Sequence, residues 1–174
     1  MRQMTATQLR EIITDINSEI DKISVLQVQI QFIQTEIPKN PQLEAIFWES
    51  LALKLHNFYT GCERIFQIIA SELNGGLPSG YDWHRRLLTR MSTEQDHRPP
   101  VLSKENARLL EEYLSFRHVV RNIYGFELDP VRLQRLADNY SHTWTLFKED
   151  ISDILLHRIK DYGVGFLSFT LRDD

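Results

Sequence analysis

The chain has very little cysteine: Cys62 is the single one in 174 residues, so no internal disulfide can form. No cluster of metal-ligating residues surrounds it, and we interpret Cys62 as a small buried residue. No apolar run approaches the ~18 residues that a membrane-spanning helix requires. The N-terminal sequence also lacks the apolar core of a signal peptide. These absences predict a cytoplasmic protein with no membrane association.

Motifs for nucleotide or metal chemistry are also missing. Asn74-Gly75-Gly76 ends a helical pattern instead of opening one, so it does not fit a phosphate-binding loop. No HExxH or CxxC motif occurs. His56, His84 and His157 lie on separate helical patterns, and we interpret them as hydrogen-bonded or solvated side chains. The sequence therefore predicts neither a metal site nor a cofactor.

The charge balance gives no general attraction to nucleic acid, because the formal net charge is −4. Any nucleic-acid site must therefore be a local basic patch. Hydrophobic residues make up 42% of the chain, which is enough for a sizeable core. We expect one domain over residues 1–174, with a core at about 5–162 and an extended tail at 163–174.

Apolar residues recur with a helical period through most of the chain, and the few glycines and prolines fall between these patterns. No strand–helix alternation is visible. We therefore predict an all-α fold, an antiparallel bundle of four long helices plus a short one. The segment 92–102 is polar, ends at Pro99-Pro100, and is expected on the surface. The predicted helices span about 8–37, 42–73, 82–91, 103–124 and 130–162, with Thr5 or Thr7, Asp82, Ser103 and Asp129 as caps and Gly125 closing the fourth.

The last two turns of the fourth predicted helix carry an unusual density of polar side chains beside its apolar stripe. Two arginines on the flank of a buried face suit an anion or another chain. The alternative is that both lie along the surface and pair with acids such as Glu112 or Glu127. The polar residues are Arg117, His118, Arg121, Asn122 and Tyr124, beside Leu109, Tyr113, Phe116, Val120 and Ile123.

The string RHVVRNIY, from Arg117 to Tyr124, resembles the signature of HepT-like HEPN-domain ribonucleases. In that signature four residues separate the Arg from the His, and one residue separates the His from the Tyr. The blocks LHNFYTGCERIF and YDWHRRLLTRM also resemble family members, so the resemblance covers about Leu43 to Ile159. One position departs from the pattern, because Asn122 stands where the motif has His.

The resemblance implies a HEPN-like helical bundle that forms a homodimer, with the motif helices of two subunits facing across a cleft. It implies the toxin of a prokaryotic toxin–antitoxin system, a metal-independent RNA endonuclease whose substrate's 2′-hydroxyl attacks the neighbouring phosphate. It also implies an MNT-type nucleotidyltransferase antitoxin that neutralises the toxin by adenylylation (AMPylation) of Tyr124. On this resemblance we expect Arg117, Asn122 and Tyr124 to be catalytic, and Arg117, Arg121 and His118 to bind the substrate phosphate.

Asn122 bears directly on the mechanism, because an amide cannot exchange a proton near neutral pH. Losing that acid–base group should slow cleavage on the order of 10²–10⁴-fold. Three versions stay open: a weakened nuclease, a nuclease that uses His118 instead, or a protein that binds RNA without cutting it. Asn122 also lies about 140° around a helix from Arg117. A two-fold axis, or a loosened last turn before Gly125, could bring the two together.

A second hypothesis comes from the length of the first predicted helix, about residues 8–37. We hypothesise that its apolar stripe exceeds what one bundle can cover, which suits pairing with a partner helix. In that case the chain is a catalytically inactive HEPN-type interaction or RNA-binding module.

Overall fold

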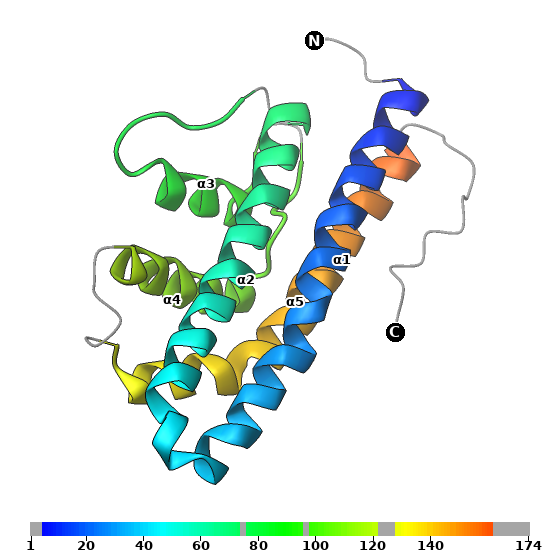
Figure 1. The fold of residues 1–174 in the computed structure, drawn as a ribbon. Coiled ribbons are helices and arrows are strands. Elements are labelled where there is room, and N and C mark those ends of the chain that lie inside the picture. Colours follow the sequence, from blue (N-terminus) through cyan, green and yellow to red (C-terminus); the bar gives the residue numbers. More distant parts are fainter. Residues whose placement is uncertain (1–4, 74–75, 96–97, 122–127, 162–174) are drawn as a thin grey trace.

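The computed structural model describes residues 5–73, 76–95, 98–121 and 128–161, and this part of the chain is all-α (Figure 1). The predicted bundle of four long helices and a short one is confirmed. The assignment of residues 1–174 to one domain stays a prediction, and the predicted tail lies outside the described residues. The helices are α1 (Ala6–Glu36), α2 (Glu44–Leu73), α3 (Trp83–Ser92), α4 (Lys104–Val120) and α5 (Pro130–Asp161), with short 3₁₀ turns η1 (Ile37–Lys39) and η2 (Pro41–Leu43) between the first two.

Thr5 caps the first helix, through reciprocal bonds with Gln8. The Gln8 N–H donates to the Thr5 hydroxyl oxygen at 3.2 Å, and the Thr5 N–H donates to Gln8 Oε1 at 2.9 Å. Pro38 and Pro41 then fall within the first two positions of η1 and η2, where a missing N–H breaks no helical bond. Helix α2 therefore begins two residues later than predicted.

All three predicted caps on the later helices directly precede their helices, but only two of them make a side-chain capping bond. Ser103 accepts a bond from the Asn106 N–H, and Asp129 accepts one from the Val131 N–H at 3.0 Å. Asp82 precedes α3, but its side chain makes no capping bond. Helix α4 is described as far as Val120, and the predicted closure at Gly125 lies outside the described residues.

Helix α2 lies at the centre of the bundle and contacts all four other helices (Figure 1). Helices α3 and α4 lie on one side of it and α1 on the other. The fully buried ring of Phe58 meets the rings of Tyr113, Tyr140 and Trp144 edge-on. Cys62 is buried beside this cluster on α2, as predicted, and burial raises the pKa of its thiol.

Eight apolar residues of α1, from Leu9 to Ile33, are buried inside the bundle, and Ile13 is partly buried against the same core. Helices α2 and α5 supply the covering faces. The idea that this stripe exceeds what one bundle can bury is therefore wrong.

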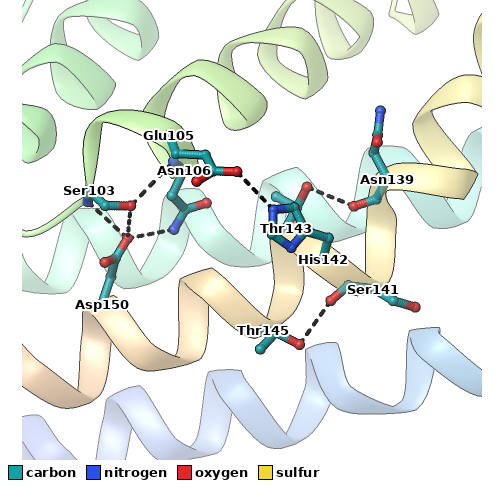
Figure 2. A network of polar contacts seen from close by, with 9 residues as sticks. All are labelled: Ser103, Glu105, Asn106, Asn139, Ser141, His142, Thr143, Thr145 and Asp150. Carbon is teal, nitrogen blue, oxygen red and sulfur yellow. Dashed lines mark hydrogen bonds and ion pairs between the residues drawn. The ribbon is translucent and has the colours of Figure 1, made fainter.

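The N-terminus of α4 is tied to α5 through a single carboxylate (Figure 2). Asp150 Oδ2 accepts bonds from the Ser103 N–H at 2.9 Å, the Ser103 hydroxyl at 3.1 Å and the Asn106 side-chain amide at 2.8 Å. The preceding segment is not simply a surface loop, because Val101 and Leu102 are buried and their N–H groups donate to the Met91 carbonyl. Helix α4 thus starts from a fixed point, which sets the position of its far end.

Among the described residues, no helix combines the length and the hydrophobicity needed to cross a membrane.

Candidate functional site

Arg117 lies in the last turn of α4 and is buried, with 8% of its surface exposed. Its Nη2 is 3.5 Å from Oε2 of Glu63, and its Nη1 is 3.3 Å from Nε2 of His84. Neither interpretation of the sequence foresaw this. Glu112 instead pairs with Arg135 at 3.4 Å, and Glu127 lies outside the described residues.

Three helices bring these groups together. Glu63 is on α2, between buried Cys62 and Ile65, so its carboxylate projects from the apolar face of its own helix. His84 is on α3, in the i, i+3, i+4, i+7 series that includes Leu87 and Met91 and faces the core. Since α4 contacts both α2 and α3, its C-terminal turn places Arg117 between the two.

The His84 ring is held from three sides. Its Nδ1 is 2.6 Å from Oε1 of Glu63, and its Nε2 faces Arg117. The Trp83 ring lies against it with centroids 3.7 Å apart and planes at 34°. The sequence interpretation of His84 as a hydrogen-bonded side chain is confirmed.

His118 and Arg121 make up the exposed edge of this site. The His118 ring is 5.9 Å from the His84 ring and nearly perpendicular to it. Desolvation, followed by the charges of His84, Arg117 and Arg85, lowers the pKa of His118 below its ordinary value. Arg121 is exposed at the C-cap of α4, and its N–H donates to the Arg117 carbonyl at 3.2 Å.

His56 and Tyr59 lie on α2, one turn apart, and both are within the electrostatic reach of Arg117. Burial lowers the pKa of His56, and the charges of Arg117 and Arg121 lower it further. Burial is also the main cause that raises the pKa of Tyr59. Three buried atoms in this region, Arg117 Nε, His56 Nδ1 and Tyr59 Oη, have no hydrogen-bond partner among the described residues. Such atoms are uncommon in folded proteins and mark a place where a polar ligand or water can bind.

The structure thus describes only some of the predicted site residues. Arg117, His118 and Arg121 lie together at the end of α4, whereas Asn122 and Tyr124 lie outside the described residues. Glu63 was missed by the sequence analysis. A signal for it existed, because a lone carboxylate inside the apolar stripe of a helix needs a buried cation.

Chemically, the arrangement is a buried guanidinium, fixed by a carboxylate and an imidazole, next to an exposed imidazole and a second guanidinium. Such a set can bind an anion and stabilise negative charge. In the described part of the chain, no three His, Cys, Asp or Glu side chains gather in the manner of a metal site.

Comparison with known proteins gives a match to the family described as HepT-like protein over residues 50–157. The matched segment is more than half of the chain and contains Glu63, His84 and Arg117. No curated protein and no solved structure matches the chain.

Proposed function

Since this chain belongs to the HepT-like protein family, we propose that it is a toxin-type, metal-independent RNA endonuclease that acts as a homodimer. The observation that carries the proposal is the buried Arg117, which Glu63 and His84 hold at the end of α4. Because the arginine is already held in place, little free energy is spent on reorganising it when it stabilises charge on a phosphate.

The exposed groups of the site supply the first contact with RNA. Arg121 and His118 lie at the surface and contact the phosphate, while the buried Arg117 adds positive charge beneath them. In a homodimer the two copies of this cluster line one cleft and make a local cationic slot. This slot overcomes the unfavourable net charge of −4, because a focused local field outweighs a weak overall one.

The reaction that fits these groups is internal transesterification. The 2′-oxygen of a ribose attacks the neighbouring phosphorus, the bond from phosphorus to the 5′-oxygen breaks, and a 2′,3′-cyclic phosphate forms. The 2′-hydroxyl loses its proton to a base, and the departing 5′-oxygen takes up a proton. Arg117 and Arg121 stabilise the charge on the pentacoordinate phosphate. His118 is the imidazole available for proton transfer, and Asn122 orients the phosphate through its amide.

Tyr124 is the proposed acceptor for AMP, with an MNT-type nucleotidyltransferase antitoxin as the partner. A phosphate-bearing group attached covalently to Tyr124 would compete with RNA for the cationic slot. Mass spectrometry after mixing the protein with that partner and ATP tests this assignment. An unmodified Tyr124 removes it.

The products of RNA incubation test the nuclease assignment. Purified protein with a chelator present should yield fragments that carry 2′,3′-cyclic phosphate and 5′-hydroxyl ends. The Asn122→His variant should be faster by a factor on the order of 10²–10⁴, because it regains a proton-transfer group. Intact RNA in all samples, or fragments with other ends, would reject the proposal.

A second candidate function, a helical interaction module, draws support from a different face of α1. Val25, Val28 and Phe32 are 56%, 71% and 60% exposed and follow i, i+3, i+7, so they form one apolar surface. Exposed apolar surfaces of this kind suit a partner helix. If the chain is such a module, the double variant Val28→Lys, Phe32→Lys should no longer associate with a partner or a second subunit. Analytical sedimentation measures this association. Unchanged association would exclude it.

A further inference from the structure

The contacts of Arg117 fix the hydrogen positions on His84. A guanidinium has only donors and stays protonated, so the Nη1 of Arg117 donates and His84 Nε2 must accept. The imidazole proton therefore sits on Nδ1 and is donated to Glu63 Oε1 over 2.6 Å. The second oxygen of the same carboxylate faces Arg117 Nη2 at 3.5 Å. The three groups thus form a closed ring in which the contact between Arg117 and His84 requires a neutral imidazole.

Protonation of His84 Nε2 would break this ring. It would place an N–H opposite the N–H of the guanidinium and two positive charges 3.3 Å apart. Glu63 would keep its bond to His84 and would compensate the new charge, so Arg117 would lose its contact with the imidazole. The side chains of all three residues are no more than a tenth exposed, so solvent screens this repulsion weakly.

We propose that His84 is a positioning residue that holds Arg117 in place while neutral and releases it when protonated, which makes RNA cleavage sensitive to acid. The effect on RNA cleavage rests on the proposed function, whereas the coupling between His84 and Arg117 does not. It assigns to α3 a role that the motif on α4 does not contain. Arg117 remains the residue that acts on the phosphate.

Among the described residues, the charged groups that face His84 come from three helices. Helix α2 contributes Glu63, and α4 contributes Arg117 and His118. On α3 itself, Arg85 contributes to the field at His118. The His118 imidazole lies 5.9 Å from the His84 ring, so its signals must be followed separately.

Two isosteric substitutions split the two contacts of His84. The oxygen of Gln in H84Q reaches the position of Nε2 and can accept from Arg117, whereas the amide nitrogen of Asn in H84N reaches the position of Nδ1 and can donate only to Glu63. We expect H84N to lose about 10²-fold in kcat/KM at neutral pH, since loss of alignment at a reacting group costs on this order. H84Q should lose less, and its rate should fall less on acidification than that of the wild type, because His118 is then the remaining imidazole of the two that acid can protonate. A purely structural role would give both variants the same profile.

Nitrogen-15 NMR of the full chain tests the coupling without RNA. The side-chain signal of Arg117 should shift on acidification together with the ring nitrogens of His84, and this shift should persist in H118Q and disappear in H84Q. An Arg117 signal that ignores His84, or that follows His118 alone, overturns the inference even if RNA is cleaved. If the shift is seen but no RNA is cleaved, the positioning holds and the nuclease proposal fails.

Discussion

Glu63 and Arg117 form an ion pair across the contact between α2 and α4, with Oε2 and Nη2 3.5 Å apart. Both side chains are less than a tenth exposed. Each charge is therefore acceptable in the interior only because the other is present. The pair joins the central helix of the bundle to the helix that carries the proposed site.

Glu63→Gln should destabilise the protein by about 3–5 kcal/mol, because it leaves Arg117 buried without a compensating charge. Denaturant unfolding measures this loss. The matched control is Glu112→Gln, which breaks the more exposed pair with Arg135 and should cost less than about 1 kcal/mol. Similar small losses in the two variants would mean that Arg117 is compensated by another group.

Asp150→Ala should destabilise the protein by about 2–3 kcal/mol, because three donors at the start of α4 lose their acceptor. One of those donors belongs to Asn106, which is fully buried. Asp153→Ala, one turn along the same helix and exposed, should change little. The midpoints of thermal unfolding of the two variants test this prediction. Equal midpoints would show that the Asp150 carboxylate does not anchor α4.

Gly61→Ala should destabilise the contact between α1 and α2, although alanine favours a helix by about 1 kcal/mol. A Cβ at position 61 would lie 2.6 Å from Cγ1 of Ile23, and overpacking of this kind costs about 1–3 kcal/mol. Adding Ile23→Ala removes the clashing atoms, so the double variant should be more stable than the sum of the single effects. Additive effects in unfolding experiments would show that the helices adjust without strain.

Stability should fall as the pH rises above about 10, where tyrosines of an unfolded chain ionise. Burial raises the pKa of Tyr59, Tyr113 and Tyr140, so the folded protein keeps protons that the unfolded chain has lost. Stability is then complete below the unfolded pKa and declines above it. Denaturant midpoints measured across this range check the slope, and a flat profile would contradict the burial of these hydroxyls.

Two tyrosine variants refine that test. The Tyr113 hydroxyl donates to the Leu136 carbonyl at 2.7 Å, so Tyr113→Phe should destabilise by about 1 kcal/mol. The Tyr59 hydroxyl has no partner among the described residues, so Tyr59→Phe should be neutral or stabilising. Both variants should lose less stability at alkaline pH than the wild-type protein does.

The sequence predicts the helices well because their signals are local. The period of apolar residues, the prolines after Ile37 and the caps at Thr5, Ser103 and Asp129 act within a few residues of where they stand. Asp82 shows the limit, because a cap residue type does not guarantee a capping bond.

The partners of Arg117 could not be predicted in the same way. Glu63 and His84 lie 54 and 33 residues earlier in the chain, and their meeting depends on how three helices are rotated against each other. Periodicity identifies the buried face of each helix but not which residues meet across the contacts. What the sequence did offer was a buried position for a carboxylate on α2 and a histidine on the inner face of α3.

The most direct test of the account compares RNA cleavage by the wild-type protein with cleavage by Arg117→Ala and Arg117→Lys, in the presence of a chelator. Arg135→Ala, which removes an exposed arginine from α5, is the control, and circular dichroism confirms that each variant is folded. The account predicts cleavage by the wild type and the control, a loss on the order of 10²-fold or more in Arg117→Ala, and partial activity in Arg117→Lys. Equal rates in all four proteins would contradict it.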